Sequence, residues 1–185
     1  MALTNQITIG TDELNARDAP VMVEVKVAHL GLDRSTNSPV VILQEKNGDR
    51  VLPIWIGHNE ASAIAMELAD MKFARPLTHD LLRQVIVGLG AKLTQVRIVD
   101  VHDNTYYAQL DLRRDDLVVQ IDARPSDSIA VALRLEAPIF TNEELLNLAS
   151  SDSQSENRPN KPLDPEALRN HLQDMDPEDF GKFIQ

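Results

Sequence analysis

Five acid–base side chains stand at or near the points where helices are expected to begin after strands. Several carboxylates and one imidazole suit a hard divalent cation, and metal-bound water with a clamped phosphate is a standard means of phosphodiester hydrolysis. Neighbouring arginines can hold phosphate oxygens in bidentate fashion. The acid–base candidates are Glu60, His79, Asp80, Asp122 and Asp127, and the candidates for binding substrate phosphate are Arg75, Arg124 and Ser126.

The densest group lies in the run from Asp122 to Arg134. A β-rich segment, 117–121, ends directly in Asp122, and Pro125 suits the first turn of a helix because that turn has no use for the missing N–H. The start of a helix also offers free N–H groups and positive dipole character. The same residues are ordinary capping chemistry, so the junction alone does not distinguish a site from a helix start.

Ion pairing within the fold is the competing interpretation. Arg75, Arg124 and Arg134 can pair with the same acids and knit the fold together, since charged clusters are not always functional sites. The chain has no Walker loop, dinucleotide fingerprint, nucleophile elbow or His-x-x-x-His pair. Geometry separates the two interpretations: metal ligands must converge on a shared, solvent-open cation position, whereas structural acids would each be buried against an arginine.

An internal similarity sets the expected architecture. Residues 55–68 align with 120–133 at a constant offset of 65, and the strands before them align in the same order. This order predicts a duplicated unit of three strands and a helix, so that 21–72 and 92–137 should superpose. We therefore expect an α+β fold, one compact domain built from the two units with additional helices.

Hydrophobic alternation and turn residues predict the individual elements. Helices are expected at 59–71, 78–89, 126–136 and 143–148, with Thr78 and Asn142 as caps and Gly88 and Gly90 ending the second helix. Strands are expected at 21–30, 39–45, 50–56, 92–101, 105–112, 117–121 and 139–141, with Asn47-Gly48 turning between the second and third.

Composition excludes several classes of function. The net charge is −11, of which 141–185 carries −6, so a basic nucleic-acid footprint is absent and a high-affinity, sequence-specific DNA binder is disfavoured. Without cysteine there is no disulfide, thiol nucleophile or zinc–thiolate site. No apolar run approaches membrane-spanning length, and the polar start lacks the apolar region of a signal peptide. We expect a cytoplasmic protein without a membrane partner.

The ends of the chain are expected to be separate from the core domain. We divide the chain into a flexible N-terminus at 1–20, a domain at 21–148, a polar linker at 149–163 and a short helical tail at 164–185. The tail holds two Asp-Pro-Glu helix starts, at 164–166 and 176–178. It is either a mobile appendage or a docking element for a protein partner.

Four strings of residues together resemble the bifunctional nuclease domain family. They are Leu52–Gly57 (LPIWIG), Glu60–Ala65 (EASAIA), Arg75–Leu82 (RPLTHDLL) and Ile121–Ala130 (IDARPSDSIA), and the resemblance spans about residues 21–148. It implies a compact α+β fold of two strand-rich units. It also implies nuclease activity on RNA and DNA in some members.

On this resemblance we expect a metal-assisted nuclease with little sequence preference, which binds nucleic acid weakly. Glu60, Asp80 and Asp122 would hold a divalent cation, Mg²⁺ or Mn²⁺, and no organic cofactor is expected. The alternative is a non-enzymatic oligomeric scaffold or regulatory module whose charged motifs are structural. We also predict a homodimer or higher oligomer, because pairing with a copy of itself is a common way to protect exposed sheet edges.

Overall fold

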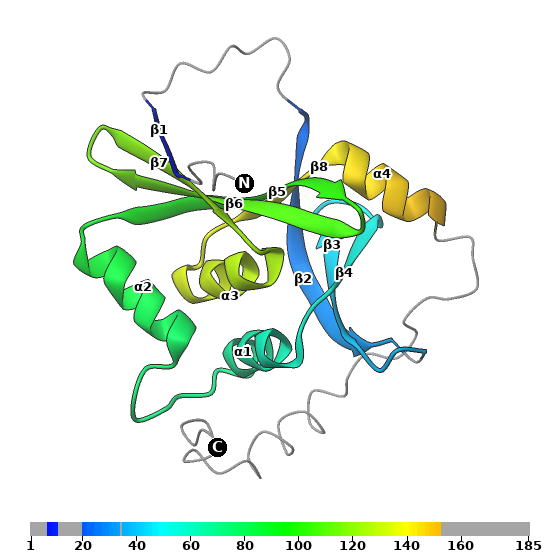
Figure 1. Ribbon diagram of the computed structural model, residues 1–185, viewed down its shortest axis with the longest axis horizontal. Helices are drawn as coiled ribbons and strands as arrows, with labels where there is room; N and C mark the ends of the chain where they lie inside the picture. The colour runs from blue at the N-terminus through cyan, green and yellow to red at the C-terminus, as the bar shows by residue number, and fades with distance from the viewer. Residues whose placement is uncertain (1–6, 11–19, 34, 153–185) are drawn as a thin grey trace, which may run out of the picture.

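An eight-stranded sheet with four helices forms the part of the chain that the computed structural model describes, residues 7–10, 20–33 and 35–152 (Figure 1). The expected α+β class is confirmed. The helices are α1 (His58–Leu68), α2 (Thr78–Gly88), α3 (Pro125–Leu135) and α4 (Glu143–Asp152). The strands are β1 (Ile7–Gly10), β2 (Met22–Leu32), β3 (Pro39–Glu45), β4 (Val51–Trp55), β5 (Lys92–His102), β6 (Thr105–Arg114), β7 (Leu117–Ala123) and β8 (Ile139–Asn142).

Two three-stranded meanders lie on either side of β8. The strand order is β1-β7-β6-β5-β8-β2-β3-β4, so β2–β3–β4 and β5–β6–β7 are each antiparallel meanders that lead into a helix, α1 or α3. β8 joins them by pairing antiparallel with β2 and parallel with β5. The strand order and helix positions therefore agree with the expected duplicated unit of three strands and a helix.

The structural correspondence between the units differs from the sequence offset of 65. The residues that cap α1 and α3 are Gly57 and Arg124, so equivalent helix positions are 67 residues apart. The offset of 65 would place Glu60 opposite Pro125, whereas the structure places it opposite Asp127. The apolar pattern located the repeat but not the exact alignment of the two units. The strand before the helix is longer in the second unit, seven residues in β7 against five in β4, and this shifts the helix relative to the sequence alignment.

Both faces of the sheet are covered at β3. Val40, Val41, Ile42 and Leu43 are all at most 7% exposed, and alternate side chains of a strand point to opposite faces. α1 contacts β3, while α4 contacts β4 and carries the buried Leu145 and Leu146. Apolar burial on both sides, at roughly 25 cal/mol per Å², holds this half of the sheet between two helices.

Several predicted turn and cap residues act as expected. Pro125 is the first residue of α3, and the side-chain oxygen of Asn142 accepts the backbone N–H of Glu144 at 3.1 Å. Gly90 has φ +72° at the end of α2, where the left-handed conformation favours glycine. Thr78 is not the cap of α2; Leu77 precedes the helix, and Asp80 accepts its N–H at 2.9 Å.

The ends of the domain extend beyond the ranges expected from sequence. The N-terminal range expected to be flexible contains β1, whose backbone pairs with the free edge of β7. α4 continues to Asp152, four residues into the expected linker, and the rest of that linker and the tail lie outside the described residues. Across the described ranges, no helix is both long and apolar enough to span a membrane.

Candidate functional site

The first turns of α1 and α3 meet at one arginine. Arg124 directly precedes α3, and its Nη2 lies 2.8 Å from Oε1 of Glu60 while its Nε donates to Oδ2 of Asp127 at 2.7 Å. Glu60 and Asp127 are the third residues of their helices, so the duplication brings equivalent acids to the same guanidinium. The Glu60 side chain is 17% exposed and that of Arg124 is 66% exposed. The arginine thus lies at the surface, with its acidic partners beneath it.

A histidine from α2 extends this cluster. Nε2 of His79 lies 3.1 Å from Oδ1 of Asp127, and the imidazole is only 13% exposed. Burial raises the pKa of Asp127, but hydrogen bonds from Arg124 and His79 outweigh it, and the pKa lies below its ordinary value. The hydrogen bond to Asp127 raises the pKa of Arg124 further. The cluster therefore contains an ionised carboxylate in contact with an imidazole and a guanidinium.

A second arginine clamps three helices together. The side chain of Arg134 is 3% exposed, and its Nε lies 2.5 Å from Oδ1 of Asp80 on α2. It also donates to the carbonyls of Ala130 on α3, at 2.9 Å, and Ala63 on α1, at 3.2 Å. Burial raises the pKa of Asp80, but hydrogen bonds from Arg134 and from the Leu77 N–H lower it by more. The pKa of Asp80 therefore lies below its ordinary value. Asp80 is therefore half-buried and paired with a buried arginine, as the structural interpretation describes.

Two of the sequence-predicted residues lie away from both clusters. Ile121 and Ala123 on β7 pack against the hydrophobic core, so Asp122 between them points to the opposite face of the sheet. Arg75 is exposed in the connection between α1 and α2 and bonds to no residue that the structure describes. The fold thus gathers Glu60, His79, Asp127 and Arg124, and separates Asp80, Asp122 and Arg75 from them.

The three predicted metal ligands do not fit one cation in this arrangement. Glu60 is bonded to Arg124, Asp80 is bonded to Arg134, and Asp122 faces the other side of the sheet. Within the described ranges, no group of three or more His, Asp or Glu side chains is placed to hold a metal ion. The divalent cation stays a prediction, and no chemical step is derived through it.

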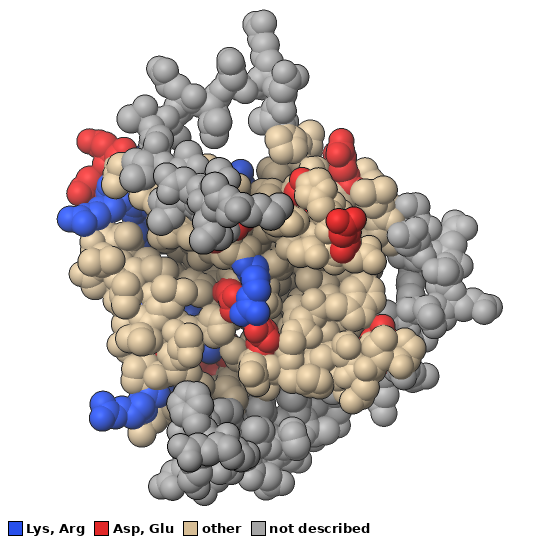
Figure 2. Space-filling view, in the orientation of Figure 1, with Lys and Arg blue, Asp and Glu red and all other residues tan. Residues whose placement is uncertain are grey.

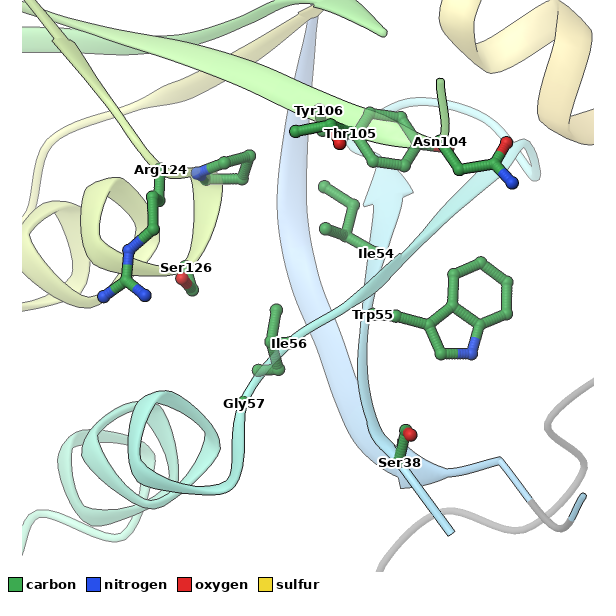
Figure 3. Close-up of a pocket in the computed structure, with 11 residues that line it drawn as sticks. Ser38, Ile54, Trp55, Ile56, Gly57, Asn104, Thr105, Tyr106, Arg124 and Ser126 are labelled. Atoms are coloured by element: carbon green, nitrogen blue, oxygen red, sulfur yellow. The ribbon is translucent and has the colours of Figure 1, made fainter. Parts of the chain in front are cut away.

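A cleft of about 380 Å³ opens beside Arg124, between the two strand-to-helix junctions and the β5–β6 turn (Figure 3). Arg124, Pro125 and Ser126 line one wall. The segment 54–57 crosses the middle, and residues 104–106 form the far wall. Both duplicated units contribute to the cleft, so it exists only in the folded whole.

Sequence reasoning missed several residues of this cleft. Asn104 was expected only in the connection between two strands and Thr105 only as the first residue of a strand, although their exposed polar side chains line it. Gly57 also lines it, and a Cβ there would collide with the Glu60 carboxylate that bonds Arg124. A glycine between a strand and a helix was the available signal. Of the two adjacent tyrosines of β6, Tyr106 lines the cleft, whereas the side chain of Tyr107 points to the opposite face of the strand.

The indole of Trp55 is fixed at the edge of the cleft by an aspartate. Nε1 of Trp55 donates to Oδ2 of Asp33 at 2.9 Å. Bonds from Ser35 and Trp55 lower the pKa of Asp33 to about 2. Figure 3 shows the indole pointing away from Arg124, so Trp55 borders the cleft without facing its cationic wall.

Charge is sparse on the face shown in Figure 2. Positive and negative side chains meet near its centre, and the other Lys and Arg side chains visible on this face are scattered, mostly toward its left side. This face carries no continuous basic area of the kind that binds nucleic acid tightly. Any grip on a phosphate here must come from a few directed groups.

Comparison with known proteins identifies relatives of the chain. The profile of the family described as Bifunctional nuclease domain matches residues 41–154, which confirms the resemblance inferred from the motifs. "Uncharacterized protein Rv1829" of Mycobacterium tuberculosis is 49% identical over 125 residues, 68% of this chain and 74% of that protein. "Bifunctional nuclease 1" of Arabidopsis thaliana is 27% identical over 111 residues, 58% of this chain and 34% of that protein. "Bifunctional nuclease 1" of Oryza sativa subsp. japonica is 24% identical over 116 residues, 61% of this chain and 35% of that protein.

Proposed function

Because the chain belongs to the bifunctional nuclease domain family, we propose that it is a nuclease that hydrolyses RNA, DNA or both with little sequence preference. The observation that carries the proposal is the cluster around Arg124. It joins a guanidinium, two carboxylates and an imidazole beside a cleft. These are the groups that phosphodiester hydrolysis requires: a cation for the phosphate, a base for the nucleophile and an acid for the leaving oxygen.

Arg124 is the proposed phosphate-binding residue. Two of its nitrogens are engaged by Glu60 and Asp127, and a guanidinium has five N–H donors in a rigid fork. The remaining donors lie on a side chain that is 66% exposed. They are available to non-bridging phosphate oxygens, while Glu60 fixes the orientation of the fork.

Asp127 and His79 are the proposed proton-transfer pair. The lowered pKa keeps Asp127 ionised at neutral pH, so it can orient the His79 imidazole and balance the charge that the imidazole gains when it accepts the proton of an attacking water or 2′-hydroxyl. The His79 imidazole at 3.1 Å shares that proton and can return it to the departing oxygen. General acid–base transfer of this kind contributes about 10²–10⁴ in rate.

The scaffold alternative also has an observation in its favour. Arg134 is buried, and its pair with the half-buried Asp80 ties together α1, α2 and α3, which is the arrangement expected of a structural acid. Glu60 and Asp127 likewise lie in the first turn of a helix, where an acid is favourable without any catalytic role. On this alternative, removing the Arg124 bonds would change stability and nothing else.

The test is cleavage of fluorogenic single-stranded RNA and DNA by the purified protein with Mg²⁺, Mn²⁺ or EDTA. Arg124→Lys keeps the charge but loses the fork, and we expect it to lower the rate at least tenfold. Arg83→Lys, at an exposed arginine of α2, is the matched control and should match wild type. Inert wild-type protein under every condition, with full-length folding confirmed, would leave the scaffold as the better account. Loss of activity in EDTA would establish that the predicted cation is needed, and the side chains that bind it would then have to move from the positions described above.

A further inference from the structure

The cleft beside Arg124 has three chemically different parts. Arg124 and Ser126 form a polar wall with positive charge, the aliphatic side chains of Ile54 and Ile56 lie in the middle, and the uncharged polar residues 104–105 form the opposite wall (Figure 3). An anion, a compact body whose carbon atoms pack on aliphatic side chains and a hydrogen-bonding edge would match these parts in order, as phosphate, ribose and base. A nucleotide has this sequence of groups.

Ser126 lines the cleft and has a hydroxyl that is not used within the described part of the fold. It is the second residue of α3 and 6% exposed, and its hydroxyl bonds to no residue that the structure describes. Every fully buried side-chain nitrogen or oxygen of the described residues has a partner. The Ser126 hydroxyl is therefore not fully buried, and the residue that carries it lines the cleft. Beside it are the backbone N–H groups of Ser126 and Asp127 in the first turn of α3, which have no partner within the helix.

The opposite wall offers groups that match a nucleobase edge. Asn104 has φ +59° in the β5–β6 turn and an exposed side chain, and Thr105 is also exposed. Neither side chain bonds to a described residue. An amide has both donors and an acceptor, as the edges of bases do, and Tyr106 adds aromatic surface on the same wall.

We infer that this cleft holds one nucleotide of a single strand, with its phosphate on Ser126, the α3 N–H groups and Arg124, and its base against Asn104, Thr105 and Tyr106. Its volume of about 380 Å³ lies at the lower end of the roughly 300–1,000 Å³ of small-ligand pockets, so it accommodates a nucleotide but not a duplex. The base must leave its stack to enter. This inference rests on the proposed function, whose substrate it narrows to unpaired strands.

Binding of adenosine 5′-monophosphate, adenosine and inorganic phosphate to the full chain tests the inference. Calorimetry gives the affinities, and the emission of Trp55, the single tryptophan of the chain, reports occupation of the cleft that it borders. We expect the monophosphate to bind at least tenfold more tightly than either adenosine or phosphate. Ser126→Ala should lower the affinity for the monophosphate and for phosphate about fivefold or more and leave the affinity for adenosine unchanged.

Two variants complete the design. Asn104→Gly keeps the positive φ without strain. It should lower the affinity for adenosine and the monophosphate but not the affinity for phosphate. Ser62→Ala removes a hydroxyl that bonds only the carbonyl of His58 in its own helix, and it should bind like wild type. Equal affinities for the monophosphate and phosphate, or an unaffected Ser126→Ala variant, would overturn the inference even if the protein cleaves nucleic acid. Tight nucleotide binding without any cleavage would support the cleft assignment while overturning the nuclease proposal.

Discussion

Replacing Asp80 by asparagine should destabilise the fold without removing a catalytic group. The change leaves the Arg134 guanidinium, whose side chain is 3% exposed, without its closest counter-charge at 2.5 Å. Breaking a buried pair by removing one partner costs about 3–5 kcal/mol. Asp80 is itself 29% exposed, and Glu67 lies 3.8 Å from Nε of Arg134, so water and a second carboxylate compensate part of this. We expect a loss of about 2–3 kcal/mol in the free energy of unfolding.

A second substitution separates the charge from the cap. The Asp80 side chain also accepts the Leu77 N–H at 2.9 Å, which an asparagine oxygen can still do but an alanine cannot. Asp80→Ala should therefore cost about 1 kcal/mol more than Asp80→Asn. Glu67→Gln is the control and should cost under about 1 kcal/mol, because its contact with Arg134 is long and partly exposed.

Urea denaturation and thermal melts measure these differences. A loss of 2–3 kcal/mol corresponds to a fall of roughly 4–12 °C in melting temperature for a chain of this length. The pKa of Asp80 is lowered in the folded state, so its contribution is complete above the unfolded value near pH 3.9 and is lost as pH falls through the lower folded value. The gap between wild type and Asp80→Asn should therefore narrow below about pH 4. An Asp80→Asn variant that melts like wild type but cannot cleave nucleic acid would refute the structural role of the Arg134–Asp80 pair.

Three further predictions concern the rest of the molecule. Asp33→Asn should lower the free energy of unfolding at pH 7 and alter the emission of Trp55. Because the pKa of Asp33 in the folded state is about 2, its ionised form stabilises the fold fully above about pH 4. The difference in stability between wild type and Asp33→Asn should therefore be smaller at pH 3. Truncation after Asp152 removes net negative charge and should leave folding intact; nucleic-acid binding at low salt should be unchanged or tighter, with any gain fading as salt screens charge. The predicted homo-oligomer has an exposed apolar face available on α2, including Leu81 at 53% and Val85 at 46% exposed; sedimentation should show a species larger than 20.6 kDa, and Leu81→Glu with Val85→Glu should reduce it.

Local signals were sufficient to predict most of the elements and the α+β class. The alternation at 21–30 predicts β2, Asn47-Gly48 predicts the β3–β4 turn, and Pro125 predicts the start of α3. Each depends on neighbours within a few residues, which the sequence displays directly. β1 is different, because its pairing depends on the edge of β7 more than a hundred residues away.

The candidate site was predicted in part, for a similar reason. Asp127 and Arg124 are three residues apart, and their contact follows from helix geometry. Helix geometry does not predict the ion pairs between distant parts of the chain. Asp80 and Arg134 are 54 residues apart, and Glu60 reaches Arg124 only because the two duplicated helices pack together. Asp122 was grouped with the others by its place in the sequence, but strand alternation turns it to the opposite face.

The cluster around Arg124 should carry out catalysis, whereas the Arg134–Asp80 pair should stabilise the fold. The most direct measurement is the single-turnover cleavage rate of Asp127→Asn and of Asp80→Asn on single-stranded RNA and DNA, at a temperature where both variants are folded by circular dichroism. We predict that Asp127→Asn lowers the rate about 10²–10⁴-fold, while Asp80→Asn stays within about threefold of wild type and has the lower melting temperature. Full activity in Asp127→Asn, or a folded Asp80→Asn variant without activity, would contradict the account.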